Sequence, residues 1–416
     1  MAQLAMKGGK PHRQKPFQGW PIPNERAEAL LVQAYREKKW SFYGEGTPIE
    51  LEFAQRFAEL HSAKYGWCVT NGSDTLRIAL RAVGVMPGDE VIVPALTWVA
   101  TATAPLRVGA VPVFADITPD TYCIDPEDVK RKITPRTKAI IPVHLYSCMA
   151  DMDAITAIAA EHRLWVIEDC AHTHGSLWRG KGAGSIGHFG SFSCQQSKVL
   201  ASGEGGILIT NDFTLLKRAF SLLNCGRPYE GEMAADASRH DETALAREET
   251  FVGDNNRISG FQAAVLLGHL PDMIPQVEKK QANMRYLDER IAKIPNCKPM
   301  FRDPRVERQS LYEYTFRYTG TKVSGSVVRA AINAEGIPLS DPYTPIYRSR
   351  LWQPSAGEFP QLLPFDYSKV SCPVAERASR HESINILHHI LLGSQQDMDD
   401  IVAAVEKVMA NLDELQ

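Results

Sequence analysis

Short, continuous apolar runs alternate with helical patterns through the first two-thirds of this chain. The runs occupy residues 90–94, 111–115, 139–143 and 164–167, and apolar side chains recur at helical spacing over residues 49–61 and 152–162. A strand that is apolar at every position is buried on both faces, which is typical of a parallel sheet covered by helices. We therefore expect an α/β fold on a mostly parallel sheet, with helices on both faces.

The length of 416 residues exceeds one typical domain, so we expect more than one. We predict an N-terminal arm and helix over residues 1–45, a large α/β domain over 46–270 and a smaller α+β domain over 271–416. Further helices are expected at residues 24–39, 75–83, 258–267, 275–293, 324–335 and 398–412, and a strand at 312–318. Lys279 and Lys280 are interpreted as part of a solvated helix face. Residues 228–249 are polar without a period, which indicates a functional loop or a contact with a neighbour.

Charge and composition exclude several classes of protein. The net charge of -3 gives no nucleic-acid footprint. No apolar run approaches the roughly 18 residues that span a bilayer, and the start of the chain has no apolar signal region, so we expect a cytoplasmic protein. The eight cysteines include no CxxC pair, which predicts free thiols and no metal site.

One lysine stands between two strand-like segments and beside a glycine cluster. Residues 189–193 and 207–210 enclose Lys198 and the glycine-rich turn 203–206. A lone lysine is most often a solvated surface charge, but a solvated lysine side chain is not expected between two apolar strands. A partly desolvated lysine has a lowered pKa and attacks carbonyl compounds, which makes Schiff-base chemistry possible.

An acidic residue follows the apolar strand at residues 164–167. Asp169 lies where ligands of doubly wound sheets bind, beyond the carboxyl end of a strand. Taken alone, it reads as a helix N-cap. Paired with a Schiff-base lysine, the carboxylate can hold a pyridine nitrogen protonated. His172 and His174 can line the same site, and one of them is expected to be structural.

Two further segments suit a phosphorylated, aromatic cofactor. Gly72 and Ser73 open a helix, whose free backbone N–H groups and positive dipole end attract phosphate. Trp98 follows another strand, where its flat side chain can stack on a ring or simply pack in the core. Together with Lys198 and Asp169, these residues supply what pyridoxal phosphate needs.

Three motifs carry a resemblance to a known family. Residues 193–206, the segment 168–172 upstream and the segment 253–257 downstream resemble the DegT/DnrJ/EryC1/StrS family of pyridoxal-phosphate aminotransferases. The resemblance covers nearly the whole chain. It implies fold type I, a homodimer with active sites at the interface, and transfer of an amino group to a ketone on a sugar or cyclitol.

The resemblance also implies roles for individual residues. Lys198 would bond the cofactor as a Schiff base, Asp169 would pair with its pyridine nitrogen, and His172 would contact the ring at a position where many members carry Gln. The remaining matches are Gly72, Ser73 and Ser193 for the phosphate, Trp98 for ring stacking, and Asn255, which reaches the phosphate of the other subunit.

Within the family, residues 191–206 and 384–392 resemble the cyclitol branch, which aminates scyllo-inosose-type ketones with L-glutamine in aminoglycoside pathways. One alternative, an aromatising dehydratase like 3-amino-5-hydroxybenzoate synthase, shares much of this pattern. A sugar-nucleotide aminotransferase is a second alternative, and such members usually differ in the segment near the C-terminus. The candidates for substrate contact are Tyr43, Arg257, Tyr343 and His388.

Two other classes fit the sequence poorly. A pyridoxal-phosphate-binding regulator usually adds a basic DNA-binding module, and no part of the chain is basic or separate enough to be one. A Rossmann dehydrogenase needs a GxGxxG motif after its first strand, and the sequence has none.

Overall fold

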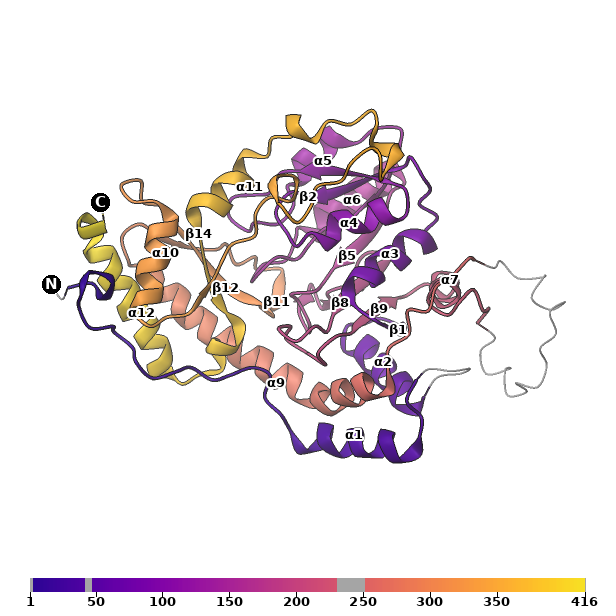
Figure 1. Ribbon diagram of the computed structural model, residues 1–416, viewed down its shortest axis with the longest axis horizontal. Coiled ribbons are helices and arrows are strands. Elements are labelled where there is room, and N and C mark those ends of the chain that lie inside the picture. The colour runs from indigo at the N-terminus through magenta and orange to yellow at the C-terminus, as the bar shows by residue number, and fades with distance from the viewer. Residues whose placement is uncertain (1–2, 42–46, 230–250, 416) are drawn as a thin grey trace.

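A seven-stranded sheet forms the centre of the computed structural model, which describes residues 3–41, 47–229 and 251–415. Tyr43 and nearly all of the interval 228–249 therefore lie outside the described residues. The strands in spatial order are β1 (Tyr65–Val69), β9 (Gly206–Thr210), β8 (Phe189–Ser193), β5 (Trp165–Asp169), β4 (Thr137–Ile140), β2 (Glu90–Pro94) and β3 (Val111–Ala115) (Figure 1).

The direction of these strands confirms the expected, mostly parallel sheet. β3, β2, β4, β5 and β8 pair in parallel, and β9 runs antiparallel to both of its neighbours, β8 and β1. β1 consequently runs in the same direction as β8. The carboxyl ends of β1, β2, β5 and β8 therefore open at one edge of the sheet, where ligands of such folds bind.

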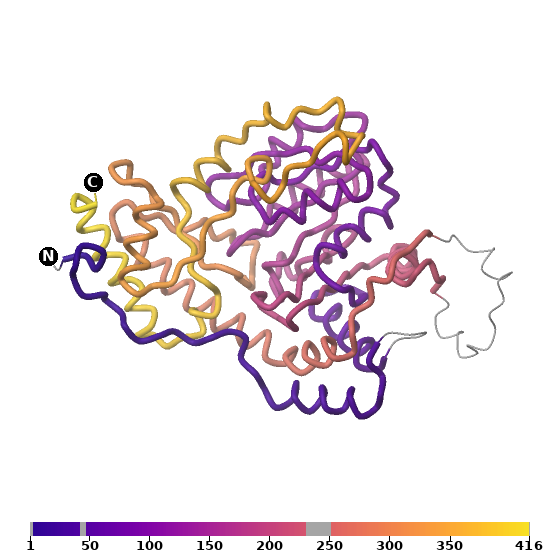
Figure 2. The backbone as a smooth tube through the Cα atoms, in the orientation of Figure 1, coloured from indigo at the N-terminus to yellow at the C-terminus, as the bar shows by residue number. Residues whose placement is uncertain are grey.

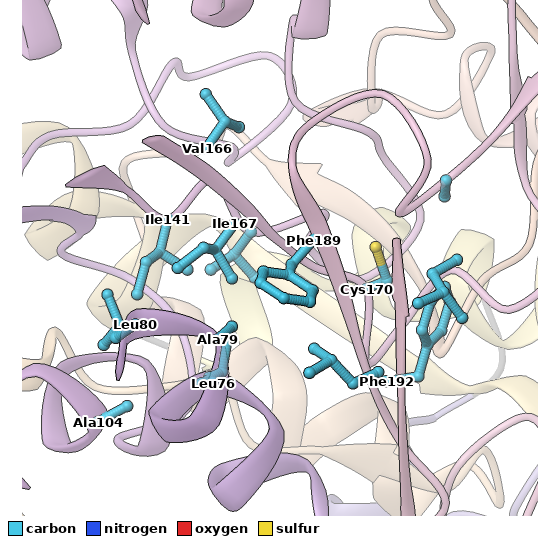
Figure 3. Close-up of a cluster of buried hydrophobic side chains, with 14 of the residues drawn as sticks. Leu76, Ala79, Leu80, Ala104, Ile141, Val166, Ile167, Cys170, Phe189 and Phe192 are labelled. Atoms are coloured by element: carbon cyan, nitrogen blue, oxygen red, sulfur yellow. The ribbon is translucent and has the colours of Figure 1, made fainter. Parts of the chain in front are cut away.

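Helices cover this sheet and bury its apolar strands. They are α2 (Pro48–Leu60), α3 (Gly72–Ala82), α4 (Ala100–Arg107), α5 (Pro126–Lys132), α6 (Met152–His162) and α7 (Phe213–Leu223). Leu76, Ala79 and Leu80 of α3 lie in one buried cluster with Ile167 and Phe189 of the sheet (Figure 3). Burial on both faces explains why these strands read as continuous apolar runs.

A second, antiparallel sheet forms the smaller part of the molecule (Figure 1). Its strands in order are β10 (Cys297–Pro299), β12 (Glu313–Tyr318), β14 (Ser383–Leu387) and β13 (Leu339–Ser340). Residues of α10 (Gly325–Ala334), α12 (Gln395–Ala410) and the end of α9 join one face of this sheet in a separate hydrophobic core. A three-stranded sheet combines β11 (Val306–Arg308), β6 (Leu177–Trp178) and β7 (Lys181–Gly182).

One long helix replaces two predicted ones. The expected helices at residues 258–267 and 275–293 are a single helix, α9 (Gly260–Ile291), which continues through Pro271 and Pro275. A proline removes a helical N–H donor, but here packing against α1 (Glu25–Glu37) and α2 overrides that local cost. Buried residues of α9 belong to both hydrophobic cores, so the helix crosses the expected boundary near residue 270. The division into domains there stays a prediction.

Two segments pack away from the part of the chain to which they belong in sequence. The N-terminal arm begins beside the C-terminal helices and runs along α9 to α1 (Figure 2). Its backbone N–H groups at Ala5 and His12 donate to the buried Glu335 carboxylate, which also pairs with Lys407. Conversely, Trp352 and Cys372 belong to the core of the large sheet.

The remaining short elements complete the described part of the chain, and several boundaries differ from the expected ones. They are η1 (Ala5–Lys7), η3 (Ile346–Arg348), η4 (Pro360–Leu362), η5 (Tyr367–Lys369), α11 (Pro373–Arg377), η6 (Ala378–Glu382), η7 (His388–Leu392) and η8 (Leu412–Leu415). β4 ends at Ile140 rather than at residue 143, and α3 begins at Gly72 because the Asn71 side chain caps it by accepting from the Asp74 N–H. All eight cysteines are free thiols, as expected. Among the described helices, none combines the length and apolarity needed to cross a bilayer.

Candidate active site

The predicted site residues lie where four parallel strands end. Gly72 follows β1, Trp98 follows β2, Asp169 closes β5 and Ser193 closes β8. Lys198 lies on the turn that leads from β8 towards β9. The sheet topology therefore gathers at one edge residues that are spread over more than a hundred positions of the sequence.

Lys198 carries a partly desolvated amine. The side chain is half-buried, and its Nζ lies 3.9 Å from the centre of the Tyr312 ring. Burial lowers the pKa of Lys198 to about 8, although the carboxylates of Asp169 and Glu313 oppose that shift. A lysine of this kind is neutral in a substantial fraction of molecules near neutral pH and is therefore a nucleophile.

Several contacts hold the backbone around Lys198 in place. The Lys198 N–H donates to the Gln195 carbonyl at 2.8 Å, and the Trp20 indole N–H donates to the Lys198 carbonyl at 3.1 Å. The Ser197 hydroxyl lies 2.8 Å from the Tyr312 hydroxyl. The N-terminal arm and the second sheet thus both contact the turn that presents the amine.

The glycine cluster allows a helix N-terminus to approach β8 closely. Gly203 has a left-handed backbone with φ +87°, and a Cβ on Gly206 would meet the Asn71 carbonyl carbon at 2.6 Å. A Cβ on Gly72 would lie 2.7 Å from the Cβ of Ser193. The first turn of α3 can therefore lie directly against the end of β8. Free N–H groups beside a serine hydroxyl suit a phosphate group.

Asp169 is buried at the end of β5. Its Oδ2 accepts from the Thr101 hydroxyl at 3.0 Å and its Oδ1 from the Ala171 N–H at 3.2 Å. Burial raises the pKa of Asp169, and the two hydrogen bonds and Lys198 oppose that rise. A cation bound to this carboxylate would offset the desolvation, which suits a protonated pyridine nitrogen. The contact from Thr101 was not foreseen, because α4 is distant from Asp169 in sequence.

His172 and His174 have different surroundings. His172 Nδ1 accepts from the Tyr146 N–H at 3.1 Å, and its ring stacks on Tyr312 with 4.2 Å between centroids. Burial lowers the pKa of His172 well below its ordinary value, so the ring is neutral with its proton on Nε2. His174 Nε2 donates to the Ser193 carbonyl at 2.9 Å, because a carbonyl only accepts. This bond ties the His174 ring to the backbone at the end of β8.

Trp98 and Tyr343, two other predicted contact residues, differ in how exposed they are. Trp98 is 51% exposed, so the core-packing interpretation does not apply to it. Its ring lies 6.2 Å from that of Tyr343, whose hydroxyl is 3.5 Å from His172 Nε2. Ring stacking by Trp98 and substrate contact by Tyr343 stay predictions.

Asn255 and Arg257 lie beside the end of α7. Asn255 is exposed and forms a bridge with Asn224, and an Nη of Arg257 donates to the Asn224 side chain at 2.7 Å. The contact of Asn255 with a second subunit and that of Arg257 with a substrate stay predictions. Tyr43 lies outside the described residues.

His388 lies beneath the Lys198 turn and contacts another lysine, Lys280, which is buried. Its Nε2 donates to the Ser197 carbonyl at 3.0 Å, so Nδ1 is the acceptor for the Lys280 amine at 3.3 Å. Both ring nitrogens of His388 therefore have partners inside the protein. Substrate contact by His388 stays a prediction.

Lys280 contradicts the interpretation as part of a solvated face. It is fully buried, while its neighbour Lys279 is exposed. α9 directs Lys280 towards His388 and the Trp20 ring, and burial lowers the pKa of this lysine to about 7. The sequence did not reveal it because a lysine in a run of charges usually lies on the surface.

A potential metal cluster is explained by hydrogen bonds. His144, Glu168 and Cys170 place ligand-type atoms together in the interior. The Glu168 carboxylate already accepts from His144 and from the backbone N–H groups of Gly184, Ile186 and Gly187. This set orders the turn before β8.

The donor set at the sheet edge fits pyridoxal phosphate. The edge combines a nucleophilic amine, a buried carboxylate, a helix N-terminus held against a serine, and exposed aromatic surface. These are the groups that bind the aldehyde, the pyridine nitrogen, the phosphate and the ring face of this cofactor.

Comparison with known proteins agrees with this assignment. Residues 23–406 match the DegT/DnrJ/EryC1/StrS aminotransferase family. The chain is 41% identical over 427 residues to the L-glutamine:2-deoxy-scyllo-inosose aminotransferase of Micromonospora echinospora, with 100% of both chains covered. It is 38% identical to the enzyme of that name from Streptomyces paromomycinus, covering 98% of this chain and 97% of the relative. A crystal structure of 3-amino-5-hydroxybenzoic acid synthase superposes with a TM-score of 0.83 at 29% identity, covering 96% of this chain and 100% of the other.

The lowered pKa of Lys198 predicts how the apoprotein takes up its cofactor. Only the neutral amine attacks an aldehyde, so the rate at which the visible absorbance of lysine-bound cofactor appears should be half-maximal near pH 8. The measurement mixes apoprotein with pyridoxal phosphate over a pH series, with Lys198→Ala as the blank. A half-maximal rate near pH 10.5, the ordinary value for lysine, would contradict the desolvated setting of this amine.

Lys280 predicts a pH-dependent stability difference. Its folded-state pKa of about 7 lies below the ordinary 10.5, so the unfolded chain binds more protons between these values and wild-type stability rises with pH there. Lys280→Met lacks that rise. The free energy of unfolding of Lys280→Met relative to wild type, from denaturant titrations, should therefore be most favourable at pH 7 and decline towards pH 10.5. Lys279→Met is the exposed control, and a difference for Lys280→Met that does not change with pH would refute the assignment.

Proposed function

This chain belongs to the DegT/DnrJ/EryC1/StrS aminotransferase family, and we propose that it transfers the amino group of L-glutamine to a cyclitol ketone of the scyllo-inosose type in aminoglycoside biosynthesis. It is a pyridoxal-phosphate-dependent aminotransferase of fold type I. The observation that carries the substrate proposal is the match over the full length to relatives named for that donor and that class of ketone. The lower identity to the 3-amino-5-hydroxybenzoic acid synthase structure gives the dehydratase alternative less support.

The geometry supports a separate role for each residue that would hold the cofactor. Pyridoxal phosphate supplies an electron sink that stabilises negative charge on the carbon of an amino acid that has lost its α-proton. We assign the phosphate to the first turn of α3, through Gly72 and Ser73, and to the Ser193 hydroxyl at the end of β8. Asp169 would hold the proton on the pyridine nitrogen. Trp98 would cover one side of the ring and exclude water from it.

Lys198 has two tasks in this proposal. Its Nζ would hold the cofactor, and as a free amine it would accept and return the proton that the substrate carbon exchanges. A pKa of about 8 suits both tasks, because the amine gains and loses a proton near neutral pH. The neutral His172 and the Tyr312 ring border this amine without adding charge.

We also propose a homodimer that acts in the cytoplasm. Tyr35 and Trp40 are large exposed aromatics whose rings stack 5.7 Å apart beside Phe261. Exposed apolar surface of this kind suits burial in an interface. Asn255 is also exposed, as a residue that serves a second subunit must be. Eight free thiols fit a reducing compartment.

The substrate proposal predicts a labelled product. Wild-type holoenzyme with 2-deoxy-scyllo-inosose and L-glutamine carrying heavy nitrogen in its α-amino group should yield an amino-cyclitol with the label, detected by mass spectrometry. Lys198→Ala should yield none. An aromatic product that has lost water, or turnover restricted to nucleotide-linked ketosugars, would contradict the cyclitol assignment.

The dimer proposal predicts recovery of activity in mixed dimers. Lys198→Ala and Asn255→Ala homodimers should both be weak, but a mixed dimer has one site with wild-type Lys198 from one subunit and wild-type Asn255 from the other. Co-expressed and separated by different affinity tags, the mixed dimer should recover up to roughly half of wild-type activity, since one of its two sites is intact. If Asn255 serves its own subunit, no recovery occurs.

A further inference from the structure

A column of four aromatic rings runs from the N-terminal arm to the reactive amine. The rings belong to Trp20, His388, Tyr312 and His172, and the centroids of consecutive rings lie 4.7, 6.0 and 4.2 Å apart. The Lys198 Nζ lies over the third ring, 3.9 Å from the centre of Tyr312. The column therefore brings together the arm, η7, the residue before β12 and the turn after β5 beside the amine.

The first two rings of this column also hold the backbone that carries the amine. The Trp20 indole N–H donates to the Lys198 carbonyl at 3.1 Å, and His388 Nε2 donates to the Ser197 carbonyl at 3.0 Å. One of these carbonyls precedes the Lys198 Cα and the other follows it. Each peptide group is planar, so a bond that fixes its carbonyl fixes the whole plane. The two bonds together set the direction in which the lysine side chain leaves the backbone.

A buried lysine fixes the proton of His388. The Lys280 amine donates to His388 Nδ1 at 3.3 Å, which keeps the ring proton on Nε2, where the Ser197 carbonyl needs a donor. Lys280 is fully buried and His388 is 1% exposed. Burying an amine costs free energy, and here the buried amine holds one tautomer of the ring above it. Both atoms that His388 needs for its bond to the turn are therefore set within the protein.

The arm is anchored on both sides of Trp20. Before it, the Arg13 guanidinium pairs with two aspartates of α12, at 2.7 and 2.6 Å. After it, the Asn24 side chain caps α1 and donates to the Gly268 carbonyl of α9 at 3.2 Å. These contacts lie outside the site. They hold Trp20 against the turn whether or not a ligand is bound.

We propose that Trp20 and His388 are positioning residues, which hold the two peptide groups around Lys198 so that its amine points at the cofactor aldehyde and at the substrate carbon. A lysine side chain has many rotamers, so the rate at which its amine reacts depends on how firmly its backbone is fixed. The two hydrogen bonds fix that backbone, and the Tyr312 ring supports the amine. This assignment rests on the role proposed for Lys198, and it gives His388 a task other than substrate contact.

The uptake of cofactor by the full-length apoprotein tests both bonds. Trp20→Phe keeps a ring but removes the indole N–H, and His388→Asn removes the donor to Ser197. His388→Gln restores a donor, because its side-chain nitrogen lies at the distance of Nε2. The visible absorbance of lysine-bound cofactor should appear roughly 10-fold more slowly with Trp20→Phe and His388→Asn than with wild type. His388→Gln should recover most of the rate. His389→Asn, at the half-buried neighbouring histidine, is the matched control.

A free amine separates positioning from general damage to the site. Lys198→Ala lacks the tethered amine, and ethylamine in solution can replace it as the group that moves the proton of L-glutamine. With Lys198 present, Trp20→Phe and His388→Asn should slow the conversion of bound cofactor by L-glutamine roughly 10-fold. In the Lys198→Ala background, either substitution should change the ethylamine-dependent rate by less than about twofold, because the turn does not hold a free amine.

Each other outcome overturns the proposal. Equal losses with the tethered and the free amine would show that the substitutions distort the site as a whole, and unchanged rates would show that the bonds do not position Lys198. A His388→Gln variant as slow as His388→Asn would remove the role of the Nε2 donor. If His388→Asn does not fold, Trp20→Phe decides, and if ethylamine restores no conversion, the uptake rates decide. Visible absorbance of lysine-bound cofactor in Lys198→Ala would instead refute the role of Lys198 itself.

Discussion

The closeness of a desolvated amine and a buried carboxylate at one sheet edge is the constraint on which the rest of the structure depends. Lys198 and Asp169 come from β-strand ends that are adjacent only because β5 and β8 pair in parallel. The antiparallel β9 then returns the chain so that Gly206 lies against the Asn71 carbonyl, which places the first turn of α3 beside them. A single topological arrangement thus provides the amine, the acid and the phosphate site.

The site balances buried charges without forming ordinary ion pairs. Burial brings the pKa of Lys198 to about 8, and those of Lys280 and Glu313 to about 7. Each of these groups consequently changes protonation state near neutral pH at little cost, which suits a reaction that moves protons and exchanges an amine in every half-cycle. The two lysines are joined by a chain of contacts through His388 and the Ser197 carbonyl.

Sequence patterns predicted those parts of the site that depend only on residues close together in the sequence. Continuous apolar runs identified the central strands. The acid stood out because it directly follows a buried strand, and the lysine stood out because it lies beside a glycine cluster between two apolar strands. Tyr312, Glu313 and Lys280 were not recognised as site residues, because their surroundings arise from packing between distant segments. The course of α9 through Pro271 likewise depends on tertiary contacts that outweigh helix propensity.

The most direct test of the account is to identify the lysine that carries the cofactor. Borohydride reduction of the holoenzyme makes the bond between the lysine amine and the cofactor permanent. Peptide mass mapping then locates the modified lysine. The cofactor mass should be found on the peptide that contains Lys198. Lys280 is the sharpest rival, since it too is a lysine whose pKa is lowered by burial. Modification at Lys280, or at any position other than Lys198, would contradict the site described here.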